Sequence, residues 1–162
     1  MTATPVPSIE PVIDTTVYPM PMFVRAEVAD LERSRRFYTE ALDFIELAAI
    51  PGPDGTPVLV HLRRWRHQDI LIVPARGEVR AGTGLGVAVA AEPGSLAGLA
   101  ERARAAGAAV VGPADTAWNT TDVTVTDPDG LPVTYTAPRW TGRNADFDDM
   151  MKDLPTAGRP DS

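Results

Sequence analysis

Residues 22–47 read MFVRAEVADLERSRRFYTEALDFIEL, a pattern that predicts a strand, a helix and the start of a second strand. Apolar and polar residues alternate from Phe23 to Ala29, which is typical of a strand with one buried side. Asp30 follows as a good N-cap, because its carboxylate can accept a free backbone N–H at the start of a helix. A second strand begins at Phe44. Between them, small or apolar side chains recur at helical spacing and predict an amphipathic helix: Leu31, Ser34, Phe37, Tyr38, Ala41 and Leu42.

Two more strands complete this first unit. Residues 51–55 read PGPDG, which favours a turn, and strands are predicted at residues 57–65 and 69–73. On the first of these strands, alternation places His61 and Trp65 on one side and the apolar residues between them on the other. The order β-α-β-β-β therefore defines module one, at residues 22–74.

The same order recurs after a linker that contains several glycines. Alternation from Leu85 predicts a strand, Ser95 is a plausible N-cap for the next helix, and three strands follow. The last two are joined by Asp127-Pro128-Asp129-Gly130, a strong turn signal because proline fixes φ and glycine accepts positive φ. We therefore predict an internal duplication, with module two at residues 84–138 and both modules in one domain at residues 21–138.

The flanks differ from this domain. Residues 1–20 contain four prolines, and we expect a flexible arm or a segment that lies extended on a partner subunit. The tail at residues 139–162 is acidic. Four apolar residues in it have helical spacing: Phe147, Met150, Met151 and Leu154. This pattern allows a short docking helix, and a frayed tail is the alternative.

Composition excludes several kinds of partner. The 162 residues carry a net charge of -7, which disfavours nucleic acid and anionic membranes as partners. No cysteine is present, so disulfides and thiolate nucleophiles are excluded. The N-terminal stretch lacks the features of a signal peptide, and no apolar run is long enough to span a bilayer. We therefore expect a cytoplasmic protein.

Two motifs together resemble the vicinal oxygen chelate superfamily, which includes glyoxalase I, bleomycin-resistance and extradiol dioxygenase proteins. The first comprises Asp30, Phe37-Tyr38 and Leu42-Asp43-Phe44, where the family commonly has glycine at the position of Asp43; the second is the turn at residues 127–130. The resemblance implies an α+β fold of two paired β-α-β-β-β modules, whose curled mixed sheets enclose a cleft and carry helices on the outer faces. It also implies a small-molecule ligand and a homodimer. Whether modules pair within one chain or between two stays open.

The candidate binding residues follow from strand alternation and from this resemblance. Arg25 and Glu27 lie two apart and share a side of their strand, either as a polar pair in the cleft or as a solvated ion pair. Tryptophans can stack on planar ligands, although core packing is the alternative use. The predicted ligand-binding residues are Phe23, Arg25, Glu27, His61, Trp65, Trp118, Asp122, Thr124 and Thr134.

The sequence departs from the metal-binding pattern of enzymes in this superfamily. The positions that usually supply ligands align with Phe23, with Gly84 or Leu85, and with Thr134. The only histidines, His61 and His67, lie in or just after one strand. We therefore expect no metal or other cofactor. A divalent metal such as Fe, Mn, Ni or Zn remains the alternative.

Two classes of function remain. The first is a metal-independent binding protein of the bleomycin-resistance type, which would sequester an apolar or aromatic compound such as an antibiotic. The alternative is an enzyme on the same fold, either a metal-free acid–base catalyst or a metal-dependent lyase, isomerase or dioxygenase. In an enzyme, Glu27 and His61 are the catalytic candidates, and Arg25 would stabilise negative charge. A third, weaker hypothesis is an interaction protein that docks a partner through its tail.

Overall fold

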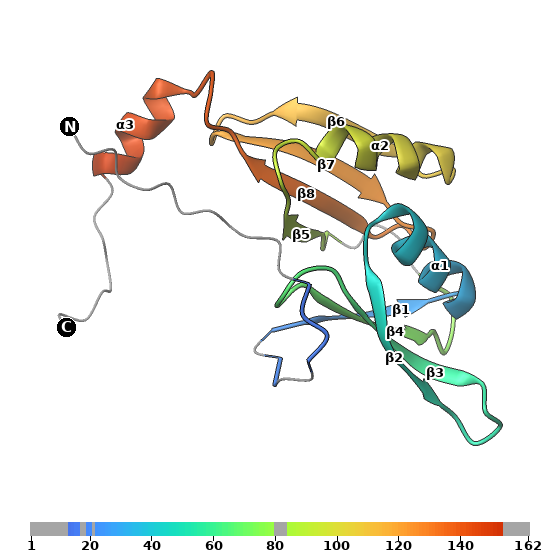
Figure 1. Ribbon diagram of the computed structural model, residues 1–162. Helices are drawn as coiled ribbons and strands as arrows, with labels where there is room; N and C mark the ends of the chain where they lie inside the picture. The colour runs from blue at the N-terminus through green and yellow to red at the C-terminus, as the bar shows by residue number, and fades with distance from the viewer. Residues whose placement is uncertain (1–12, 17–18, 21, 80–83, 154–162) are drawn as a thin grey trace.

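The computed structural model describes residues 13–16, 19–20, 22–79 and 84–153. Module one contains β1 (Val24–Val28), α1 (Leu31–Ala41), β2 (Ile45–Pro51), β3 (Pro57–Arg63) and β4 (Asp69–Pro74). Module two contains β5 (Val87–Ala90), α2 (Leu96–Ala105), β6 (Val110–Asp115), β7 (Thr120–Thr126) and β8 (Pro132–Pro138), and α3 (Ala145–Asp153) follows it. The predicted α+β class with two β-α-β-β-β modules is confirmed (Figure 1).

The two modules build separate sheets with the same topology. Sheet A has the strand order β1-β4-β3-β2, and sheet B has the order β5-β8-β7-β6. In each sheet the first strand pairs in parallel with the last strand of its module, and the other pairs are antiparallel. The first strand of each module therefore lies at the edge of its sheet.

Local chemistry explains where the first helix begins and ends. The Asp30 carboxylate accepts a hydrogen bond from the Arg33 backbone N–H at 2.9 Å, as an N-cap does. The chain leaves the helix through Asp43, whose φ of +59° is the left-handed conformation that glycine adopts at this place in other helices. Two details of module two differ from expectation, although Ser95 does occupy the N-cap position of α2. The Ser95 hydroxyl donates to the Glu92 carbonyl instead of capping α2, and Leu85 is exposed ahead of β5.

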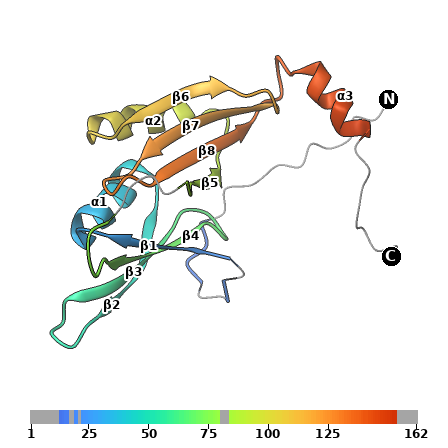
Figure 2. The same ribbon diagram turned by 180° about the vertical axis from the view of Figure 1, so that it is seen from behind.

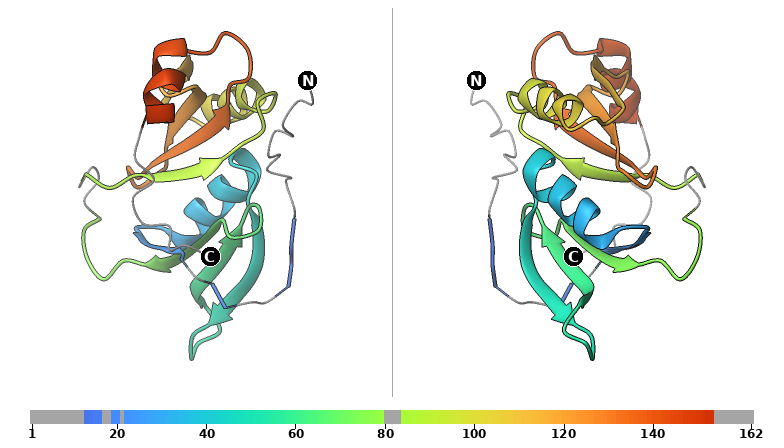
Figure 3. Two further views of the ribbon diagram at one scale, coloured as in Figure 1. Left: turned by 90° about the vertical axis from the view of Figure 1, so that its left-hand side faces the viewer. Right: turned by 90° about the vertical axis from the view of Figure 1, so that its right-hand side faces the viewer.

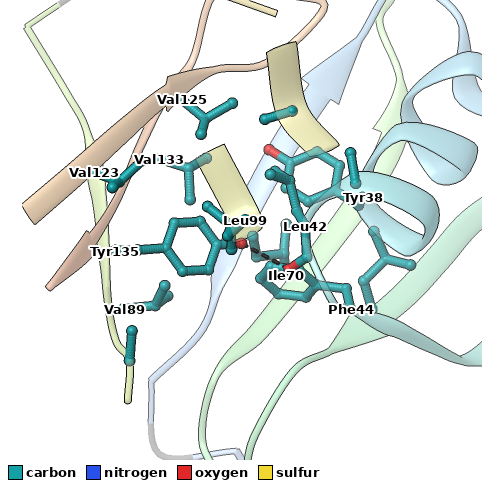
Figure 4. Close-up of a cluster of buried hydrophobic side chains, with 14 of the residues drawn as sticks. Tyr38, Leu42, Phe44, Ile70, Val89, Leu99, Val123, Val125, Val133 and Tyr135 are labelled. Atoms are coloured by element: carbon teal, nitrogen blue, oxygen red, sulfur yellow. Dashed lines mark hydrogen bonds between the residues drawn. The ribbon is translucent and has the colours of Figure 1, made fainter. Parts of the chain in front are cut away.

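The helix-bearing faces of both sheets contribute to one hydrophobic core. Tyr38, Leu42 and Phe44 of module one lie close to Tyr135 and to the valines of sheet B (Figure 4). Helices α1 and α2 contact each other, and α1 lies at a level between sheet A and β5 (Figure 3). The other labelled members of this core are Ile70, Val89, Leu99, Val123, Val125 and Val133.

Hydrogen bonds cross this shared core in both directions. The Tyr38 hydroxyl donates to Asp127 Oδ2 at 2.9 Å, and the Tyr135 hydroxyl donates to the Leu42 carbonyl at 2.8 Å. The turn at residues 127–130 also docks on α1, because Asp129 accepts from the Ser34 hydroxyl at 2.9 Å. Its carboxylate further accepts from the Ala29 backbone N–H and from Arg33. The two modules are thus joined through their helix-bearing faces.

In the described part of the chain, no helix covers the opposite face of either sheet. We call these faces the open side of sheet A, which carries Arg25, Glu27, His61 and Leu71, and the open side of sheet B, which carries Asp122, Thr124, Thr134 and Thr136. Since both helix-bearing faces meet in the core, the open sides point away from it. Among the residues that the structure describes, the two sheets of one chain therefore do not face each other across a cleft.

The flanking segments are described only in part. The Pro-rich arm prediction falls mostly on residues 1–12 and 17–18, which lie outside the described residues, as does Leu154 of the predicted tail helix. Helix α3 stands at one end of sheet B, away from sheet A (Figures 1 and 2). Asn119 holds it there, donating to Asp148 Oδ1 at 2.8 Å and accepting from the Asn144 backbone N–H. Within the described segments, no helix is long and apolar enough to cross a membrane.

Candidate functional site

The open side of sheet A carries a polar row across three strands. The strand register places Arg25 of β1 beside Leu71 of β4, and Leu71 beside His61 of β3. Arg25 Nη1 and Glu27 Oε1 form an ion pair at 3.3 Å, in which the two side chains are 56% and 49% exposed. Phe23, just before β1, is also exposed. Glu27 is therefore a half-exposed, paired carboxylate and not a buried acid.

A buried network fixes His61 on this side. His61 Nε2 lies 2.7 Å from Asp69 Oδ1, and Arg63 Nε donates to the same oxygen at 2.7 Å. The Asp69 and Arg63 side chains are almost fully buried, whereas that of His61 is 18% exposed. Asp69 was not predicted as a site residue. The available signal was its place at the start of β4, where alternation puts it on the same side as Leu71.

The N-terminal arm contacts the same network. Arg63 Nη1 donates to the backbone carbonyls of Asp14 and Thr16, at 2.8 and 2.9 Å. Hydrogen bonds from Thr16 hold the pKa of the Asp14 carboxyl below its usual range. The described part of the arm therefore packs against one end of the open side of sheet A and covers Arg63.

The open side of sheet B is a ladder of hydroxyl groups around one carboxylate. Asp122 Oδ1 accepts from Thr120 and Thr136, both at 2.8 Å. Thr124 and Thr134 are directly paired across β7 and β8, with their hydroxyl oxygens 2.8 Å apart. All of these side chains are partly exposed. This surface offers hydrogen-bond donors and acceptors but few apolar atoms.

The predicted binding residues therefore fall into separate groups. Phe23, Arg25, Glu27 and His61 belong to module one, and Asp122, Thr124 and Thr134 belong to sheet B. Trp65 lies in the turn after β3, buried beneath the Arg64 guanidinium, whose Cζ is 4.1 Å from the ring centroid. Trp118 is exposed in the turn between β6 and β7. A role in binding stays a prediction for each of these residues.

The sequence did not identify Arg64 as a site residue. In the structure, this side chain joins the two modules. Its Nη1 donates to the Ala90 carbonyl of β5 at 2.6 Å, and its Cζ lies 5.1 Å from the centroid of the Tyr135 ring. Burial lowers the pKa of the Arg64 guanidinium. A cation between two aromatic rings at a module boundary has no periodic signature in the sequence, so only the packing shows it.

Two hollows on the surface lie on the helix-bearing side and not on the open sides. One, of about 730 Å³, runs between α1 and the segment that links α2 to β6, with Phe37 and Ala108 in its lining. The other, of about 420 Å³, lies between α1 and the base of the β2–β3 hairpin and includes Leu31 and Pro57. Neither of these two hollows is lined by a predicted binding residue.

The donor atoms near the expected metal positions do not fit a metal ion. Phe23 and Leu85 have no ligating side-chain atom, and the Thr134 hydroxyl is engaged by Thr124. Across the ranges that the structure describes, no group of three acidic, histidine or cysteine side chains could hold an ion. Divalent metals of the expected kinds need such nitrogen and oxygen ligands together. The absence of a metal stays a prediction that direct titration can test.

The comparisons with solved structures agree with this topology. TnmS3, an antibiotic binding protein from Streptomyces sp. CB03234, is 24% identical with a TM-score of 0.58, over 72% of this chain and 93% of that chain. A glyoxylase/bleomycin resistance protein/dioxygenase domain from Frankia sp. EAN1pec is 23% identical with a TM-score of 0.60, over 76% of this chain and 100% of that one. The fosfomycin resistance protein FosX from Listeria monocytogenes is 13% identical with a TM-score of 0.60, and the match covers 76% of this chain and 97% of FosX.

At these identities the likeness shows the fold and not the ligand. No match is found among curated proteins. The sequence itself matches the family model of the Glyoxalase/Bleomycin resistance protein/Dioxygenase superfamily over residues 23–135, which spans both modules. The chain therefore belongs to the glyoxalase/bleomycin resistance protein/dioxygenase superfamily.

Proposed function

We propose that this protein is a metal-independent small-molecule binding protein that sequesters an apolar or aromatic compound. The ligand cleft forms between the open side of sheet A in one chain and the open side of sheet B in a second chain. One observation carries this proposal: the helix-bearing faces share one core, so the two open sides point away from it within a chain. A homodimer supplies the missing wall of each cleft.

The chemistry of the two walls suits binding. Sheet A offers an apolar residue, Leu71, between two polar groups, Arg25 and His61, and sheet B offers the hydroxyl ladder around Asp122. Small-molecule sites commonly combine apolar surface with a few polar groups that orient the ligand. The antibiotic-binding TnmS3 among the structural neighbours is consistent with such a role.

A complementation experiment tests the location of the cleft. Ala48→Trp fills the open side of sheet A next to His61, and Thr134→Trp fills the open side of sheet B. Each variant alone should lose binding of 7-methoxycoumarin in equilibrium dialysis. After the two are unfolded and refolded together, each heterodimer has one cleft with two unaltered walls, and binding should return.

Two results would refute a cleft formed between two chains. If each cleft were formed by one chain, every cleft in the mixture would keep one altered wall, and binding would stay absent. A wild-type chain that sediments as a monomer and still binds the probe would also refute the proposal. Ala97→Trp, on the exposed surface of α2, is the control that should leave binding unchanged.

An enzyme on the same fold is the second candidate, and the hydrogen-bonded His61–Asp69 pair favours it. Glu27 and His61 would act as acid and base, with Arg25 stabilising developing negative charge. Glu27→Gln separates the two candidates. The variant should lose turnover by orders of magnitude if the protein is an enzyme, whereas a binding protein should lose at most part of its affinity.

A further inference from the structure

The His61 network determines which kind of hydrogen bond this side chain can offer to a ligand. Asp69 accepts from Arg63 Nε and is therefore an ionised carboxylate, with its charge balanced by the guanidinium. At 2.7 Å from Asp69, the His61 Nε2 atom must carry a proton and donate it. In the neutral ring, Nδ1 then has a lone pair and acts as an acceptor. Nδ1 has no partner within the described segments of the chain.

The neighbours of His61 define the space next to this acceptor. Leu71 lies beside it in the strand register, and Arg25 lies on the far side of Leu71. Adjacent strands are about 4.8 Å apart, so the backbones of Arg25 and His61 are separated by about 10 Å. A planar compound of two or three fused rings spans this distance. Leu71 gives it an apolar surface to lie on.

Arg25 offers the complementary kind of hydrogen bond at the other end of the row. It uses only Nη1 toward Glu27, and a guanidinium has five donors. The row therefore presents an acceptor at one end, an apolar surface in the middle and donors at the other end. A ligand that satisfies all three carries a hydroxyl group toward His61 and an oxygen acceptor toward Arg25.

We infer that the cleft binds planar aromatic compounds with a free hydroxyl group, and that His61 Nδ1 accepts the hydrogen bond from that hydroxyl. This inference rests on the proposed function, because it names the class of compound that the same cleft takes. Asp69 and Arg63 are positioning residues that hold the ring with Nδ1 available.

Matched pairs of phenols and their methyl ethers test this inference. The probes are 7-hydroxycoumarin with 7-methoxycoumarin, and 2-naphthol with 2-methoxynaphthalene. Dissociation constants are measured by equilibrium dialysis with the full-length chain. We expect each phenol to bind about tenfold more tightly than its ether, because the ether leaves the acceptor without a donor.

Variants of His61 assign this preference to one atom. His61→Phe removes both ring nitrogens and should bring the phenol-to-ether ratio close to one, with affinity for the ether largely kept. His61→Gln can donate to Asp69 through its amide nitrogen and still present an oxygen acceptor, so it should retain most of the preference. Thermal unfolding checks that both variants keep the fold.

Each other outcome refutes a defined part of the reasoning. Equal binding of phenol and ether by the wild-type chain overturns this inference and leaves the proposed binding function intact. A phenol preference that survives in His61→Phe overturns the assignment to His61. No binding of any probe at about 1 mM overturns both the inference and the proposed function, since even weak cleft binding would be detected at this concentration.

Discussion

The two buried tyrosines give a direct test of how the modules are joined. Tyr38 and Tyr135 are both 0% exposed, and each donates a hydrogen bond from one module to the other. The acceptors differ, because Tyr38 donates to the Asp127 carboxylate and Tyr135 to the neutral Leu42 carbonyl. Substitution by phenylalanine removes only the hydroxyl and leaves the ring packing in place.

The expected losses in free energy of unfolding depend on whether the acceptor of each hydrogen bond is charged. Tyr38→Phe leaves Asp127 Oδ2 buried without its donor, and hydrogen bonds to charged groups contribute about 1.5–3 kcal/mol. Tyr135→Phe removes a hydrogen bond between neutral groups, which contributes about 0.5–1.5 kcal/mol. We therefore expect Tyr38→Phe to lower the free energy of unfolding by about 2 kcal/mol, and Tyr135→Phe by about 1 kcal/mol.

Urea unfolding followed by circular dichroism measures both values. One protein concentration is used throughout, because the proposed dimer would shift the midpoint by mass action. Asp127→Asn and its combination with Tyr38→Phe complete a double-mutant cycle that isolates the coupling between hydroxyl and carboxylate. A loss for Tyr38→Phe no greater than that for Tyr135→Phe would refute the argument, because the charge of the acceptor would then have no effect.

Three further predictions concern pH, backbone strain and α3. Burial raises the pKa of the Tyr38 and Tyr135 hydroxyls in the folded state. Their contribution to stability is therefore fully present below the pKa of about 10 in the unfolded chain, and it is lost as pH rises above that pKa. The urea concentration at the midpoint of unfolding should fall between pH 8 and pH 11, and it should fall less steeply in Tyr135→Phe. Gly112 has a φ of +95°, and an added Cβ would lie 2.4 Å from the Asp122 carbonyl, whereas Gly107, at +84°, has open space around it. Gly112→Ala should therefore cost more than about 3 kcal/mol and Gly107→Ala only about 1–2 kcal/mol in urea unfolding, and equal costs would contradict the clash. Asn119→Gly keeps the positive φ but removes the amide that holds α3, so hydrogen exchange should accelerate about tenfold in residues 145–153 and stay unchanged in β7.

The elements of each module could be predicted because their signals are local. Alternation in β1, the Asp30 cap and the turn at residues 127–130 each depend on a few consecutive residues. These signals gave the order of strands and helices, and the family resemblance then implied that the two modules pair in one fold. The partner of the Tyr38 hydroxyl could not be found in this way, because Asp127 lies 89 positions further along the chain.

The site could be predicted only in part, for a reason of register. His61 reaches Asp69 because of how the turn after β3 closes. The Arg64 backbone N–H donates to the Gln68 carbonyl, the Gln68 N–H donates to the Trp65 carbonyl, and His67 has a positive φ. A shift of one residue in that turn would move Asp69 to the helix-bearing face. Alternation places each strand residue on a side, but it does not say which residues of two strands are opposite each other. Alternation put Asp69 on the same side as Leu71 but did not show that it faces His61, and the Arg64 stack had no signal in the sequence.

The free-energy cost of burying the charged Arg63–Asp69 pair next to His61 supports a role for His61 on the open side of sheet A. Arg63 and Asp69 are both almost fully buried, and taking two charges out of water consumes much of the free energy that their attraction returns. Apolar residues of similar volume would pack beneath the N-terminal arm at no such cost, so the pair does little for stability by itself. Its distinct effect is on His61, whose ring it holds by one nitrogen so that the other is available next to Leu71. We therefore expect stability and ligand preference to separate at this place: substitutions at His61 should change which compounds bind far more than they change the free energy of unfolding.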